Sequence, residues 1–213
     1  LLPMMDKESI ASLVALFLLR KPLTEAVGLS FSKVIKACWI AIFFGFFITM
    51  LLNGDPLVFD AGAIPGLRMW DYIGIAFTQF FSLFVPFWVG YRLLSTGEAH
   101  QRLVYWIAFG GMIYLLPMLW EVRMSPQLHA QMYGFFPHSF AQQIRDGGFR
   151  PVVFLGHGLL VAFFAFSACV CAFAWMKSQS KLWKIPSKVV FLALILGVLA
   201  CKTLSVVFYL VLA

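Results

Sequence analysis

The feature that most limits the fold of this chain is a series of long apolar runs. Several are about 20 residues or longer, enough for a helix to cross roughly 30 Å of hydrocarbon. They do not alternate with period two, as strands of a membrane barrel would. Overall, 62% of the residues are hydrophobic and 12% are charged, whereas a soluble domain has about half and about a quarter. We therefore predict an all-α fold, a polytopic transmembrane helical bundle.

The apolar runs predict a single transmembrane domain over residues 1–213. Its expected spans are 9–22, 34–53, 71–94, 101–120, 151–176 and 189–213. The run at 9–22 is short and would span only with snorkelling ends. In the run at 101–120, Gly110 and Gly111 would let a neighbouring helix approach closely. Because the chain starts at a leucine and ends inside an apolar run, we interpret it as part of a longer protein.

Basic residues are divided unevenly between the two sets of alternating loops. One set carries ten: Arg20, Lys21, Lys33, Lys36, Arg92, Arg102, Lys177, Lys181, Lys184 and Lys188. The other carries four: Arg68, Arg123, Arg145 and Arg150. Loops rich in lysine and arginine stay in the cytoplasm. The polar loop 121–150 is therefore expected to be extracytoplasmic.

The polar loop carries signals for two short helices and a cluster of arginines. Cap and stop residues predict helices over 126–134 and 139–148. Arg145 would lie on the last turn of the second helix, and Arg150 would follow across two glycines. Guanidinium groups bind phosphate oxygens in a bidentate manner, so their convergence predicts an anionic ligand. The alternative is that the arginines pair with nearby acids as solvated surface charge.

Two ionisable residues fall inside predicted spans. His157 would lie about 9 Å below the outer end of span 151–176, and Lys202 about 8 Å below the same surface in span 189–213. An intramembrane lysine is usually functional, and histidine is suited to proton transfer near neutral pH. The alternatives are an interhelical hydrogen bond for His157 and an ion pair or snorkelling for Lys202.

The remaining polar side chains indicate no metal or cofactor site. The cysteines lie inside apolar runs without zinc-ligand spacing, which favours small buried hydrophobic roles. His129 and His138 are expected at the surface of the polar loop. No nucleotide-binding or hydrolase motif is present, and no nucleic-acid partner is expected.

Two strings of the polar loop carry a family resemblance. They are E-x-R-M-S-P-Q-L-H-x-x-x-Y-G at 121–134 and Q-Q-x-R-x-G-G-F-R-P-V-V-F-x-x-H-G at 142–158. The chain resembles bacterial O-antigen polymerase/ligase-like membrane proteins of exopolysaccharide assembly. C-K-T-L at 201–204, N-x-D-P at 53–56 and P-G-L at 65–67 are similar too.

The resemblance implies a multi-pass glycosyltransferase of the bacterial inner membrane. Such enzymes transfer an undecaprenyl-pyrophosphate-linked glycan to a glycan or lipid acceptor outside the cytoplasm, alongside polysaccharide-assembly proteins. By this likeness Arg145 and Arg150 would hold the pyrophosphate, with Arg123 beside them. His157 would act as the base or orienting group at the acceptor hydroxyl. Glu121 and Lys202 complete the predicted substrate-binding set.

Two other functions fit the same residues. A transporter or flippase of an anionic lipid or solute would also use arginines and a membrane lysine, and would show inverted repeats and broken helices at mid-membrane. A non-catalytic assembly subunit would pair its arginines with partners or with acids of the chain. The gathering of charge at the outer boundary favours the transferase.

Overall fold

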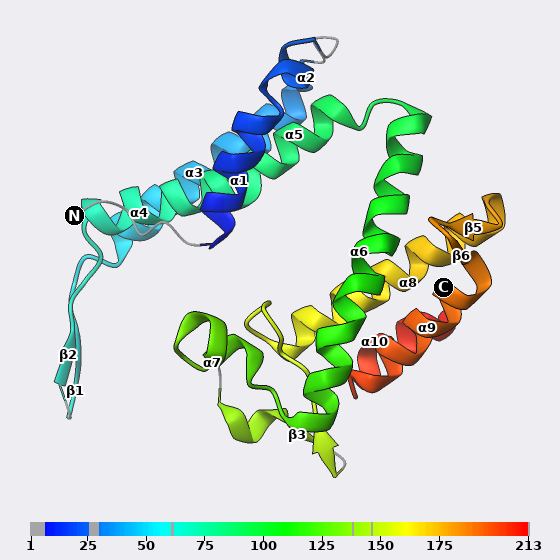
Figure 1. The fold of residues 1–213 in the computed structure, drawn as a ribbon. Helices are drawn as coiled ribbons and strands as arrows, with labels where there is room; N and C mark the ends of the chain where they lie inside the picture. The colour runs from blue at the N-terminus through cyan, green and yellow to red at the C-terminus, as the bar shows by residue number, and fades with distance from the viewer. Residues whose placement is uncertain (1–6, 26–29, 61, 138, 146, 213) are drawn as a thin grey trace. The chain divides into compact units, whose positions relative to one another are not determined.

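The computed structural model describes residues 7–25, 30–60, 62–137, 139–145 and 147–212. The chain divides into two compact units, Leu1–Gly97 and Glu98–Ala213, and each is described separately. Both consist mainly of apolar helices (Figure 1). The helical fold class expected from the sequence is thereby confirmed.

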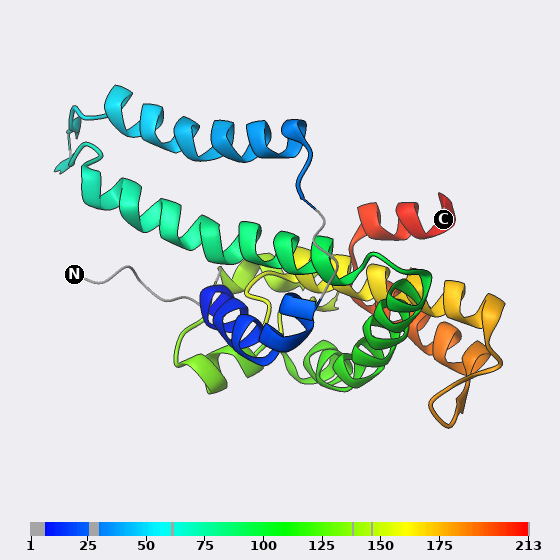
Figure 2. The same ribbon diagram turned by 90° about the horizontal axis from the view of Figure 1, so that it is seen from above.

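The first unit is built on two long apolar helical segments. Its described elements are α1 (Lys7–Leu18), α2 (Arg20–Glu25), α3 (Lys33–Leu52), β1 (Leu57–Phe59), β2 (Gly62–Ile64), α4 (Met69–Gln79), the π-helix η1 (Phe80–Phe84) and α5 (Val85–Leu93). The last three form one continuous helical stretch, which runs alongside α3 (Figure 2). β1 and β2 pair as an antiparallel hairpin beyond the ends of α3 and α4.

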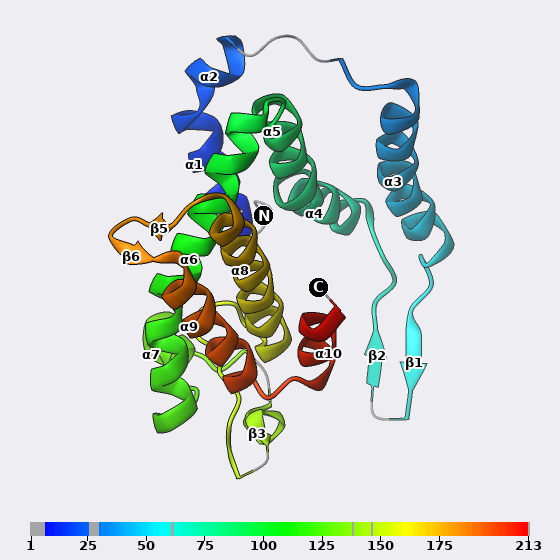
Figure 3. The ribbon, with the colours of Figure 1, turned by 90° about the vertical axis from the view of Figure 1, so that its right-hand side faces the viewer.

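The second unit contains the polar loop. Its described elements are α6 (Gly97–Met124), α7 (Leu128–Tyr133), the 3-10 helix η2 (Phe140–Gln143), β3 (Ile144–Arg145), β4 (Gly148–Phe149), α8 (Gly158–Ser178), β5 (Lys181–Leu182), β6 (Ile185–Pro186), α9 (Ser187–Ala200) and α10 (Leu204–Leu212). α8 and α9 lie side by side, and α10 turns back to contact both (Figure 3). Small residues such as Ala162, Ala165 and Ala168 fill the core and allow close helix packing.

In the described part of the chain, four helices are long and apolar enough to cross a membrane. They are Lys33–Leu52, Met69–Leu93, Gly97–Met124 and Gly158–Ser178. They correspond to the spans predicted at 34–53, 71–94, 101–120 and 151–176. Length and composition thus support a membrane protein.

Three boundaries differ from the sequence-based prediction. The segment 9–22 is not one helix, because α1 and α2 are separated by a turn at Leu19. The span expected from 151 begins only at Gly158, because Val153 has a left-handed φ of 48° that an α-helix cannot contain. The single span expected over 189–213 is broken at Lys202, whose φ is 49°.

Candidate functional site

The buried carboxylate of Glu121 fixes the polar loop against the end of α6. Oε2 accepts hydrogen bonds from the backbone N–H groups of Val152 and Val153, both over 2.7 Å. Oε1 accepts one from the N–H of Leu128 over 2.9 Å. Both oxygens are thus bound to backbone on the two sides of the loop. This geometry gives Glu121 a positioning role, and its binding of substrate stays a prediction.

Arg145 lies in a β-hairpin and not on the last turn of a helix, as predicted for 139–148. Helical structure there is limited to η2, after which β3 and β4 pair with Arg145 opposite Gly148. The sequence between these partners is Asp-Gly, the dipeptide typical of a tight two-residue hairpin turn. Gly147 has the left-handed φ of 68° that such a turn requires. The turn signal therefore outweighed the capping pattern.

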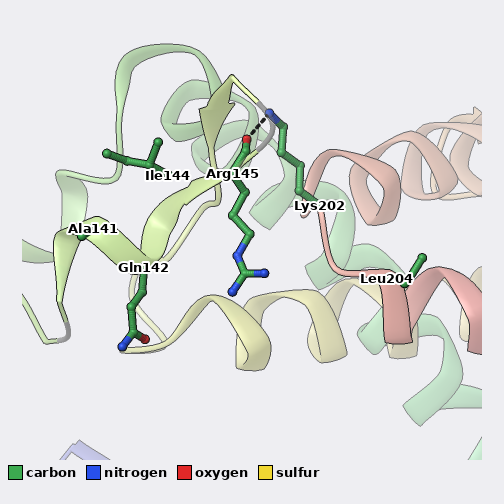
Figure 4. A pocket seen from close by; sticks show the side chains of 6 residues that line it. All are labelled: Ala141, Gln142, Ile144, Arg145, Lys202 and Leu204. Carbon is green, nitrogen blue, oxygen red and sulfur yellow. Dashed lines mark hydrogen bonds between the residues drawn. The ribbon is translucent and has the colours of Figure 1, made fainter.

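A cavity of about 380 Å³ opens between the hairpin and the α9–α10 turn. Its lining residues are Ala141, Gln142, Ile144, Arg145, Lys202 and Leu204 (Figure 4). The Lys202 ammonium donates a hydrogen bond to the backbone carbonyl of Arg145 over 2.9 Å. The Arg145 side chain extends away from that ammonium. Two of the predicted cationic residues therefore line one cavity.

Arg150 is buried beside this hairpin. Its side chain is 5% exposed and covers the first residue of α8, since a Cβ placed on Gly158 would come within 2.6 Å of Arg150 Nε. Nε and Nη2 are buried without a hydrogen-bond partner among the described residues. Burial lowers the pKa of Arg150, and the nearby charge of Arg145 lowers it further. A buried cation at the positive end of a helix is costly unless an anion joins it.

Gln143 is a polar residue that sequence reasoning missed. Its side chain is fully buried, and neither amide atom has a hydrogen-bond partner among the described residues. Its backbone carbonyl accepts a hydrogen bond from the N–H of Arg150 over 2.8 Å. Gln143 and Arg150 are therefore joined by a backbone hydrogen bond, and each has buried side-chain nitrogen or oxygen atoms without a partner among the described residues. The only sequence signal was the position of Gln143 two residues before Arg145.

His157 is the N-cap of α8 and does not lie inside the helix, so the predicted depth of about 9 Å, which assumed helical rise from residue 151, does not follow. Its Nδ1 accepts a hydrogen bond from the backbone N–H of Leu159 over 3.0 Å. In the neutral ring the proton then resides on Nε2, which makes Nε2 a donor. This geometry favours the orienting role over the base role, because a base would first have to release Leu159.

The depth predicted for Lys202 also assumed a continuous helix. Lys202 lies in the turn between α9 and α10, not within a continuous span. Its half-buried side chain reaches the β3–β4 hairpin, where a Cβ on Gly148 would come within 2.5 Å of the Lys202 Nζ. Lys202 is nevertheless brought to Arg145, as a shared site requires.

Other loop residues lie apart from the cavity or outside the description. Arg123 is exposed on the last turn of α6 and does not line the cavity. His129, expected at the surface, is 3% exposed and its Nδ1 lies 3.1 Å from the Phe135 carbonyl oxygen. His138 and Asp146 lie outside the described residues.

Comparison with models of known protein families, with curated proteins and with solved structures found no match. Within the described part of the chain, no three His, Cys, Asp or Glu side chains are grouped as metal ligands would be. Arg145 and Lys202 line the cavity, and the buried Arg150 lies near Arg145; we call these three residues the cationic cluster.

Proposed function

We propose that this chain belongs to a glycosyltransferase that polymerises or ligates undecaprenyl-pyrophosphate-linked glycan repeat units at the periplasmic face of the bacterial inner membrane. The observation that carries the proposal is the buried guanidinium of Arg150, whose Nε and Nη2 have no hydrogen-bond partner among the described residues. It lies near Arg145, which lines a cavity together with Lys202. An anion with several oxygens satisfies such a cluster, and a pyrophosphate has both the charge and the acceptors.

The reaction follows from the leaving group. The hydroxyl of a glycan or lipid acceptor attacks the anomeric carbon, and the bond from that carbon to the pyrophosphate oxygen breaks. The hydroxyl proton leaves to a base, and the products are a new glycoside and the prenyl pyrophosphate. Charge grows on the pyrophosphate as its bond breaks, and fixed cations stabilise that charge. The amino end of α8 adds a partial positive charge of the same kind.

His157 is proposed to orient the acceptor. It caps α8 immediately before Gly158, which Arg150 covers, so the histidine and the buried cation meet at one helix end. Because Nδ1 accepts a hydrogen bond from Leu159, Nε2–H is a donor, and we propose that it binds the hydroxyl oxygen of the acceptor glycan or lipid. The broken span at Lys202 favours the alternative function, a transporter or flippase of an anionic lipid or solute, because broken helices line substrate paths in transporters.

The test replaces Arg145, Arg150 and His157 one at a time in the full-length protein. Surface polymer and lipid-linked repeat units are measured, the latter on each side of the membrane. A transferase predicts lost polymer with repeat units accumulating outside. The matched control is Arg102→Gln, an exposed arginine paired with Glu98 at 3.8 Å, which is expected to leave polymer unchanged.

Two outcomes would contradict the transferase function. Repeat units that accumulate on the cytoplasmic side would identify a flippase. Polymer that persists in all three variants would show that the cluster has no part in the reaction.

A further inference from the structure

The connection between α8 and α9, together with the two adjoining residues of each helix, covers residues 177–188 and forms a second cationic surface, which we call the basic hairpin. It contains four exposed lysines and no acidic residue: Lys177, Lys181, Lys184 and Lys188. The cationic cluster of Arg145, Arg150 and Lys202 contains none of these lysines. What the basic hairpin binds is therefore a separate question.

The basic hairpin is held rigidly on the helices. β5 pairs with β6, and Leu182 between them is 1% exposed. The indole Nε1–H of Trp175 donates to the Lys181 carbonyl over 3.0 Å. The Ser187 hydroxyl donates to the Gln179 carbonyl over 2.8 Å. Its lysines thus extend from a fixed frame and not from a flexible tether.

Trp183 stands at the turn of the hairpin, where one part of its ring packs edge-to-face against Phe109 of α6, with 5.8 Å between the ring centroids. Trp183 is 64% exposed and has a left-handed φ of 54°. The Lys184 ammonium lies 5.9 Å from the centre of its ring. An exposed tryptophan beside lysines is the pattern of side chains that sit at the boundary between hydrocarbon and headgroups.

The position of the basic hairpin at the end of α8 indicates which kind of partner it binds. α8 is long and apolar enough to cross a membrane, and α9 packs against it. In a bilayer the short connection between such helices lies at the level of the lipid headgroups. Lysines at that level attract anionic lipids by about 1 kcal/mol each.

We propose that the basic hairpin binds anionic phospholipid headgroups, with the lysine ammonium groups on the phosphates and Trp183 inserted among the glycerol and acyl carbons. A neighbouring cavity of about 370 Å³ adjoins Trp175, and the Arg102 side chain in its lining is paired with Glu98. It is lined by Glu98, Gln101, Arg102, Tyr105 and Trp175. This proposal requires membrane insertion but not the transferase activity.

The test measures which lipids remain with the full-length protein. The protein is reconstituted in discs of phosphatidylcholine and phosphatidylglycerol and extracted gently, and the retained lipids are quantified by mass spectrometry. The wild type is expected to be enriched in phosphatidylglycerol. The double variant K181Q/K184Q is expected to bind it roughly tenfold or more weakly. Trp183→Ala keeps the charge and is expected to show a smaller loss.

The matched control is K33Q/K36Q, which removes two exposed lysines from the first turn of α3. It is expected to lose less of the enrichment than K181Q/K184Q. Equal retention by K181Q/K184Q and the wild type would overturn the proposal, and so would an equal loss in the control. Displacement of the lipid by inorganic phosphate at matched ionic strength would also overturn it, because free phosphate would then be the ligand. Circular dichroism of each variant confirms that the helices are intact.

Discussion

The Lys202 ammonium bonds to the Arg145 carbonyl over 2.9 Å, although the two residues are 57 positions apart in the chain. This bond connects the α9–α10 turn to the β3–β4 hairpin and closes one side of the cavity. Replacing Lys202 with Met removes the donor, which is worth about 1 kcal/mol. Amide hydrogen exchange in 144–149 should then rise about fivefold. Lys21→Met, at an exposed position of α2, should leave that exchange unchanged.

Arg150→Met should stabilise the protein while abolishing its proposed function. The change removes a buried cation whose pKa is lowered by burial, so the charged form costs stability in the folded chain at neutral pH. A gain of about 1 kcal/mol or more is expected, since methionine fills a similar volume without charge. Thermal unfolding in detergent gives the stability, and surface polymer gives the activity. A less stable Arg150→Met variant would show that the guanidinium is already paired.

His157→Asn separates capping from chemistry. An asparagine oxygen can accept the Leu159 N–H as the Nδ1 of His157 does, so helix α8 should keep its stability. His157→Ala should lose about 1 kcal/mol with the cap. If His157 orients or deprotonates the acceptor, both variants lose polymer. Full activity in His157→Asn would mean that the histidine serves only as a cap.

Glu121→Gln should weaken the loop. The glutamine amide offers one oxygen to three backbone donors, so at least one N–H of Leu128, Val152 or Val153 loses its acceptor. A buried donor left without a partner costs about 1–3 kcal/mol. The measurement is the thermal midpoint, with Glu98→Gln on the exposed first turn of α6 as the control. Equal midpoints for the two variants would contradict the positioning role.

Two adjacent glycines of α6 should respond oppositely to alanine. A Cβ on Gly111 would lie 2.3 Å from Ala168 Cβ of α8, a rigid neighbour that cannot yield without separating the helices. Gly111→Ala should therefore destabilise the second unit by about 1–3 kcal/mol. A Cβ on Gly110 meets nothing within 4 Å, so Gly110→Ala should be neutral or stabilise by up to about 1 kcal/mol. Thermal unfolding of both variants checks the contrast.

The helices were predictable wherever the local sequence decides them. The spans at 34–53, 71–94 and 101–120 follow from uninterrupted apolar runs, and the stop of α7 follows from Gly134 in its left-handed conformation, φ 79°. The hairpin at 144–149 was missed, although Asp-Gly at its turn is a local signal. A helix-capping pattern at Ser139 and Gln142 competes with that signal over the same stretch, and only the tertiary structure decides between the two.

The candidate site was predictable by residue type but not by geometry. The sequence identified Arg145, Arg150 and Lys202 as cations with a reason to be near one another. It could not show that Arg150 is buried, that Gln143 lies beside it, or that Arg123 lies apart. Those facts depend on which backbone groups pair across the loop.

What the sequence determined by itself is the membrane-compatible helical character, because hydrophobicity over some 20 residues is a local property of the chain. The tertiary structure alone decided where α8 begins and where the last apolar run breaks. The start of α8 depends on the carboxylate of Glu121 binding amides 31 and 32 positions away, and the Lys202 ammonium bonds across the break to Arg145. Hydrogen bonds over such separations form only when packing brings their ends together, so no local pattern reports them.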